Sequence, residues 1–109
     1  MDAIAFIAVG SSDTQTLGEL TVKSVAGTES GKTQLTVEPQ LASITNVLKY
    51  KTNASAATSV TYGMDVKTWT KWDGVSEIPV TSGYHITVVE CDQNYKAIRS
   101  GDVVAVVKS

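Results

Sequence analysis

The chain has 109 residues, of which 42% are hydrophobic and 18% charged, and its formal net charge is −2 with an isoelectric point near 5.2. This length is typical of one domain, and the composition is too apolar for a disordered tail. The nine Lys and Arg residues are scattered and form no basic cluster, which argues against nucleic-acid binding. The composition is also too polar for a membrane span.

The first predicted element is the apolar stretch of residues 3–9, which turn residues follow. No Lys or Arg precedes this short stretch, so we expect no signal peptide. Both faces of the stretch are apolar, so we expect it to join its own sheet or to add to a neighbouring chain. We therefore divide the chain into an N-terminal strand and linker (1–17), for docking or oligomerisation, and a domain (18–109). The candidate docking residues are Ile4, Phe6, Ile7 and Val9.

Alternating strands dominate the next part of the chain. Residues 19–25 place Leu20 and Val22 on one face, and residues 32–38 alternate cleanly until Pro39. A turn with two glycines separates these two runs, so we expect them to lie adjacent, whether or not they pair in one sheet. Residues 40–45 read as a connection, and residues 46–52 as a further strand.

The second half is irregular at first and then strand-rich. Residues 62–74 predict a short turn or a single helical turn near Asp65 to Trp69, and the run around Pro79 can only be a short edge strand. The strongest strand covers residues 84–91, and residues 95–99 and 102–108 predict two more strands separated at Ser100-Gly101. Both faces of the last run are apolar, so we expect it to be central or covered. Taken together, the pattern predicts an all-β fold: an immunoglobulin-like β-sandwich of about seven to eight short strands with an extra N-terminal strand.

The residues that could carry chemistry do not form a recognisable site. His85 lies within a predicted strand and is expected to face solvent, and Cys91, the only cysteine, reads as a lone packed thiol. Glu90 and Asp92 share one strand face, as paired catalytic or calcium-binding carboxylates would, but we interpret them as a solvated strand end. No zinc-ligand spacing is present. We therefore predict no enzyme, no catalytic residue, no metal site and no cofactor.

An aromatic turn is the one feature with binding potential. Trp69 and Trp72 lie close in sequence, with Tyr62 and Tyr84 on either side. Exposed Trp side chains stack on sugars and anchor protein interfaces. The favoured interpretation is that one or both Trp side chains plug the end of the sandwich; protein contact and glycan contact are the alternatives. These four aromatic residues are the candidate interaction site.

Several weak motifs in a fixed order carry a family resemblance from Leu20 to the C-terminus. They are "LTVKSVAGTESGKTQLTVEP", "LKYKT", "YGMDVKTWTKWDG" and "ITVVECDQNYKAIRSGDVVAVV". In this order they resemble small bacterial and phage immunoglobulin-like modules, found on tailed-phage capsid and tail proteins and in bacterial surface proteins. No single motif is diagnostic.

The resemblance implies a non-enzymatic phage or prophage virion accessory protein of the head-decoration or head-fibre type. Its partner would be a capsid or other virion protein, and its location the virion after synthesis in the host cytoplasm. The apolar N-terminal stretch, which must be covered, is the reason to expect a homo-oligomer. The alternative is a bacterial surface or glycan-binding module that uses the aromatic turn on a cell-surface glycan.

Overall fold

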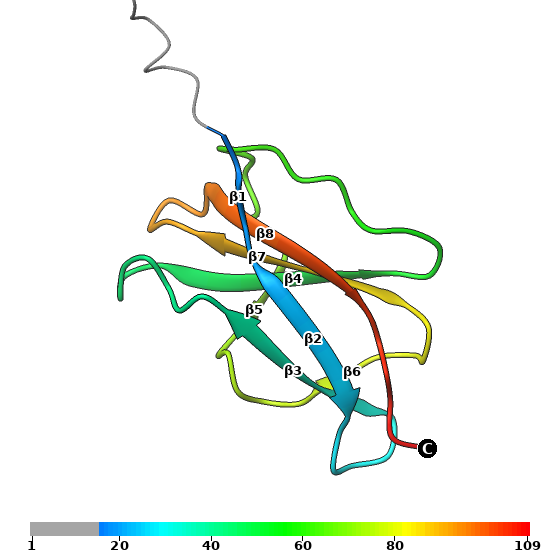
Figure 1. Ribbon diagram of the computed structural model, residues 1–109. Helices are drawn as coiled ribbons and strands as arrows, with labels where there is room; N and C mark the ends of the chain where they lie inside the picture. Colours follow the sequence, from blue (N-terminus) through cyan, green and yellow to red (C-terminus); the bar gives the residue numbers. More distant parts are fainter. Residues whose placement is uncertain (1–15) are drawn as a thin grey trace, which may run out of the picture.

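The computed structural model describes residues 16–109, which form eight strands in two sheets (Figure 1). The described residues contain no helix, and therefore none that could cross a membrane. The prediction of an all-β sandwich is confirmed, whereas the strand expected over residues 3–9 lies outside the described part of the chain. The strands are β1 (Gly18–Glu19), β2 (Thr21–Ala26), β3 (Lys32–Glu38), β4 (Val47–Asn53), β5 (Thr70–Trp72), β6 (Ile78–Pro79), β7 (His85–Cys91) and β8 (Ala97–Val104).

The larger sheet has the strand order β1-β8-β7-β4-β5, and the smaller sheet has the order β2-β3-β6. Every pair is antiparallel except β1 and β8, which run parallel. The chain changes sheets at Leu20, whose N–H donates to the Ser100 carbonyl at 2.8 Å before β2 begins to pair with β3. The first described segment therefore supplies an edge strand to each sheet: β1 to the larger and β2 to the smaller.

The β2–β3 hairpin settles a pairing that the sequence left open. The register runs from Thr21 opposite Glu38 to Ala26 opposite Thr33, and Gly31 completes the turn with a φ of 81° that favours glycine. Pro79 in β6 lies at the outer edge of this sheet, as predicted, because it has no N–H to give to a further strand.

The last strand differs from the prediction. β8 is one continuous strand through Ser100 and Gly101. Gly101 is needed here because any side chain would clash with the neighbouring chain: a Cβ would lie only 2.2 Å from the Leu20 carbonyl oxygen. The glycine lets β8 pass the point where the chain changes sheets, instead of ending a strand there. The expectation that the final run is central or covered agrees with the place of β8 between β1 and β7, although Val104 and Val106, at and beyond its end, are each 49% exposed.

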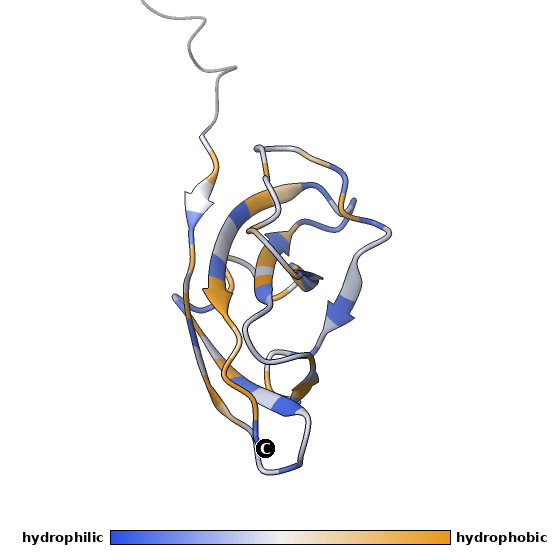
Figure 2. Cartoon of the chain, turned by 90° about the vertical axis from the view of Figure 1, so that its right-hand side faces the viewer, coloured by the Kyte–Doolittle hydropathy of each residue, from blue (hydrophilic) through white to orange (hydrophobic). Residues whose placement is uncertain are grey.

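The core has two parts because the central strand β7 is covered on both faces. Ile86 and Val88 point between the sheets, where they meet Leu35 and Ile78 of the smaller sheet. Val89 packs on the opposite face against a second cluster supplied largely by the segment between β4 and β5. Burial of each such side chain contributes about 1.5–3 kcal/mol. Figure 2 shows the matching alternation of apolar and polar residues along the strands.

Candidate interaction surface

The indole of Trp72 is part of the core. Trp72 ends β5, is 5% exposed and packs between the sheets, and its Nε1–H donates to the Ser76 carbonyl at 2.9 Å. The following turn is closed by Asp73, whose Oδ1 accepts from the backbone N–H groups of Val75 (2.8 Å) and Ser76 (2.7 Å). Hydrogen bonds from the Ser76 hydroxyl and these backbone groups lower the pKa of Asp73 to about 2. The Trp-Asp-Gly turn is thus a packing and turn-forming device.

The four candidate aromatic residues do not form one site. Trp69 is 8% exposed and packs with Val89 on the outer face of the larger sheet, so that sheet separates it from Trp72. Tyr62 is 40% exposed beside the start of β8, where the N–H of its neighbour Gly63 donates to the Ala97 carbonyl. Tyr84 is half-buried beyond the other end of β8. Two buried indoles on opposite sheet faces offer no shared stacking platform, and a role in binding stays a prediction for Tyr62 and Tyr84.

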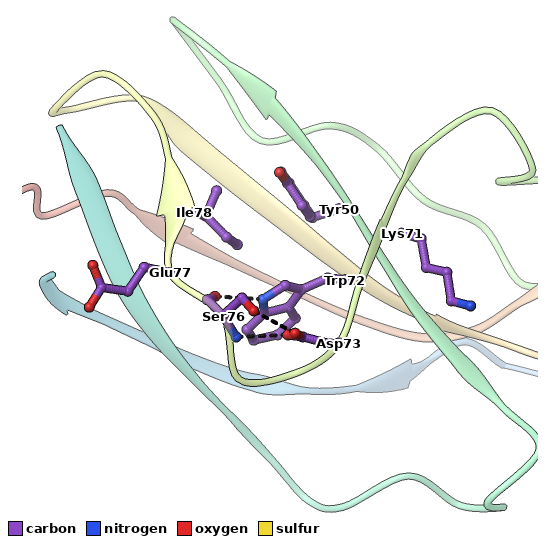
Figure 3. Close-up of a pocket in the computed structure, with 7 residues that line it drawn as sticks. All are labelled: Tyr50, Lys71, Trp72, Asp73, Ser76, Glu77 and Ile78. Atoms are coloured by element: carbon purple, nitrogen blue, oxygen red, sulfur yellow. Dashed lines mark hydrogen bonds between the residues drawn. The ribbon is translucent and has the colours of Figure 1, made fainter. Parts of the chain in front are cut away.

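A groove of about 370 Å³ lies between the edge strands β5 and β6 (Figure 3). Tyr50 and Ile78 approach the Trp72 indole from opposite sheets, and the Tyr50 hydroxyl has a raised pKa because the ring is partly buried. The rim consists of Lys71, Asp73, Ser76 and Glu77. Its volume falls at the lower end of small-molecule sites.

The carboxylates on the rim are already engaged within the domain. Glu77 accepts hydrogen bonds from the N–H (2.9 Å) and hydroxyl (2.6 Å) of Thr28, which lower its pKa and tie β6 to the β2–β3 turn. Asp73 closes its own turn, as described above. Lys71, which is exposed, is the ionic group on this rim most open to a ligand.

A second hollow, of about 410 Å³, lies where the connection between β3 and β4 meets the turn after β5. Leu41 and Ile44 line it, with Leu48 and Gly74 beside them, and the exposed fraction is 39% for Leu41 and 97% for Ile44. Val75, next to Gly74, is 72% exposed. We call the space lined by Leu41, Ile44, Leu48 and Gly74, and also by Gln40 and Asp73, the apolar hollow. The sequence analysis predicts only a connection over residues 40–45. The apolar Leu41 and Ile44 among small polar residues are the feature that could have indicated the hollow.

A buried carboxylate holds that connection in place. Glu90 is 0% exposed, and it accepts hydrogen bonds from the Ala42 N–H (2.7 Å), the Asn46 side-chain amide (2.7 Å) and the Arg99 Nε–H (2.6 Å). Arg99 also forms an ion pair with Glu90 through Nη2, and the same nitrogen donates to the Gln40 carbonyl at 2.8 Å. The interpretation of Glu90 as part of a solvated strand end is therefore wrong, because its face of β7 points between the sheets.

The remaining candidates for chemistry lie apart. Asp92 accepts from the backbone N–H groups of Asn94 and Lys96 in its own turn and does not join Glu90 in a site. His85, at the other end of β7, lies 3.4 Å from the Asp102 carboxylate. The buried Cys91 thiol donates to the Val47 carbonyl at 3.4 Å, and burial raises its pKa. Among residues 16–109, no group of three or more His, Cys, Asp or Glu side chains could hold a metal ion.

These features define an immunoglobulin-like sandwich domain with several exposed apolar side chains. The family described as "S-layer protein SbsC C-terminal domain" matches residues 25–103. Because this match covers most of the chain, the protein belongs to that family of surface-layer domains.

Two solved structures resemble the fold. The crystal structure of domains 7, 8 and 9 of the S-layer protein SbsC aligns with a TM-score of 0.63 and 26% identity, over 96% of this chain and 34% of that one. The structure of domains 4–9 of the surface layer protein SbsC aligns with a TM-score of 0.63 and 23% identity, over 94% of this chain and 18% of that one. The chain thus spans about a third of the first structure and about a fifth of the second. No curated protein matches it.

The family match corrects the functional part of the sequence analysis. The resemblance to phage decoration modules, the virion function, the capsid partner and the virion location are wrong, because both the family and the similar structures are those of surface-layer proteins. The alternative of a bacterial surface module agrees better with these findings.

Proposed function

We propose that this chain is a structural domain of a bacterial surface layer that acts through contacts with protein neighbours and has no catalytic role. The observation that carries this proposal is the family match over residues 25–103. The chemistry of the site agrees with it, since Glu90, Asp73 and Glu77 are all used in internal hydrogen bonds.

Contacts between copies would follow from the exposed apolar side chains. Single exposed hydrophobic residues are ordinary on protein surfaces, but contiguous patches mark interaction sites. We propose that the protein forms a homo-oligomer, and that residues 1–17 serve docking while residues 18–109 form the domain. Ile4, Phe6, Ile7 and Val9 are the proposed docking residues.

Surface labelling would test the function directly. An antibody against the purified protein should decorate intact cells that make it, and protease added to those cells should remove the signal. Electron microscopy of the purified chain should also reveal ordered assemblies as its concentration rises. A protein found only inside intact cells, and monomeric at every concentration, would contradict the proposal.

Glycan binding in the groove between β5 and β6 is a second candidate, favoured by the Tyr50 ring and the exposed Lys71 on one wall. A pull-down on cell-wall polysaccharide should show saturable binding that Lys71→Ala weakens. Lys23→Ala, which removes an exposed lysine from the smaller sheet, is the matched control. Equal binding by the two variants would exclude the groove.

A further inference from the structure

The apolar hollow is preformed, because each of its walls is fixed by hydrogen bonds. Glu90 and Arg99 hold the backbone at Ala42 and Gln40, so Leu41 lies between two anchored residues. On the opposite wall, Asp73 and Gly74 lie in a turn that is closed because the Asp73 carboxylate accepts hydrogen bonds from the N–H groups of Val75 and Ser76. Apolar side chains on a rigid support lose little conformational entropy when a partner covers them, which favours binding.

We propose that this hollow receives the apolar N-terminal segment, residues 3–9, of a second copy of the chain. The inference rests on the proposed function and specifies which contact links two copies. The donor is a segment of stated sequence, "AIAFIAV", and the acceptor is the apolar hollow.

The composition of the segment matches the hollow. Alternation along an extended chain places Ile4 and Phe6 on one face and Ile7 and Val9 on the other. A segment lying on the surface of a single domain would leave one of these faces in water. Between two copies both faces are covered, one by the hollow and the other by the domain that meets it. This difference favours exchange between copies.

The place where the N-terminal segment leaves the domain lies close to the hollow. A Cβ at Gly18 would contact the Arg99 side chain at 2.6 Å, and Arg99 Nη2 lies 2.8 Å from the carbonyl oxygen of Gln40, which lines the hollow. The end of β3, the start of β4 and the start of β8 also share this end of the sandwich (Figure 1). Residues 10–17 can span up to about 27 Å when extended.

Donor and acceptor at the same end imply a reciprocal exchange. Two copies that meet end to end can each place the segment in the hollow of the other without moving a strand. Such an arrangement is a closed two-fold dimer, the commonest symmetry for soluble oligomers.

Disulfide trapping between two full-length copies would test the contact. One tagged copy carries Phe6→Cys and the other Ile44→Cys, while the native Cys91 is buried in both. The mixed copies should form a disulfide-linked heterodimer at least about tenfold faster than a mixture of Phe6→Cys with Val25→Cys. Val25 is a suitable control because it is 57% exposed but lies on the smaller sheet. Equal rates would overturn the proposal.

A variant with both Phe6→Cys and Ile44→Cys in one chain separates the two routes of docking. Trapping as a covalent dimer supports exchange between copies. Trapping at high dilution as an internally linked monomer would overturn it, because the segment would then occupy the hollow of its own domain.

Sedimentation provides an independent measure that uses no cysteine. Ile44→Asp should weaken dimerisation by at least about a hundredfold, since it removes from each of two contacts an apolar side chain that the dimer would bury. Val25→Asp should leave dimerisation unchanged, and thermal melts should confirm that both variants fold. If intact cells still display the protein but both trapping and sedimentation fail, the contact is wrong and the surface-layer function stands.

Discussion

Replacing Arg99 by Met should strongly destabilise the domain. The substitution keeps an apolar stem but leaves the Glu90 carboxylate, which is 0% exposed, with no cation. Removal of one partner from a buried ion pair costs about 3–5 kcal/mol. The Arg99 side chain is 19% exposed, so water can partly replace it, and we expect a loss near the lower end of that range. For a domain of this size, about 3 kcal/mol corresponds to a fall in Tm of roughly 12–24 °C.

Urea unfolding followed by tryptophan fluorescence would measure this loss, because both indoles leave the core on unfolding. The matched control is Lys96→Met, which removes another cation but from a solvent-exposed pair with Asp65, 3.6 Å apart. This control should change the free energy of unfolding little. The double variant Glu90→Gln with Arg99→Met should be more stable than Arg99→Met alone, since it has no buried charge. A loss below about 1 kcal/mol for Arg99→Met, or no recovery in the double variant, would refute the reasoning.

Three further perturbations test other parts of the structure. Gly101→Ala should destabilise the domain by about 1–3 kcal/mol in a urea melt, because the new methyl group meets the Leu20 carbonyl; an unchanged midpoint would contradict the close approach. The turn closed by Asp73 should be fully formed above about pH 4 and should open as the pH falls toward 2, since the pKa of this carboxyl is about 2 in the folded chain and its ordinary value is 3.8. The amide signal of Val75 in NMR spectra should follow this transition, and the Asp73→Asn variant should lack it. The Cys91 thiol should react with iodoacetamide only after unfolding, because burial and a raised pKa keep it protonated; rapid alkylation of the native protein would show otherwise.

The fold could be predicted from the sequence because the alternation of apolar residues depends on local geometry alone. Leu35 and Val37 lie on the same face of β3 regardless of which element packs against that face. The two-glycine turn connects β2 to β3, its partner strand. Gly101 misled the prediction because a glycine that ends a strand and a glycine that allows a close approach have the same sequence signature. Only the sheet change at Leu20, about 80 residues earlier in the chain, distinguishes the two cases.

The candidate surface could not be predicted because distant residues create it. Glu90 is buried by Ala42 and Asn46, which lie 48 and 44 residues away in the sequence, so alternation alone does not reveal its partners. Leu41 and Ile44 form a hollow only after the turn at Gly74 has been placed against them. The functional error has a different origin, since motifs that specify a sandwich do not specify the particle or cell on which it is used.

The parallel pairing of β1 with β8 has a mechanical consequence. Glu19 opposite Ser100, together with the bond from Leu20, ties the entering chain to the last strand, and the described chain enters and leaves at opposite ends of the sandwich (Figure 1). Tension applied between the two ends therefore loads these hydrogen bonds together in shear, whereas strands peeled from one end break their bonds one at a time. A domain pulled along this direction should resist stretching, and we expect the hydrogen bonds between β1 and β8 to break first.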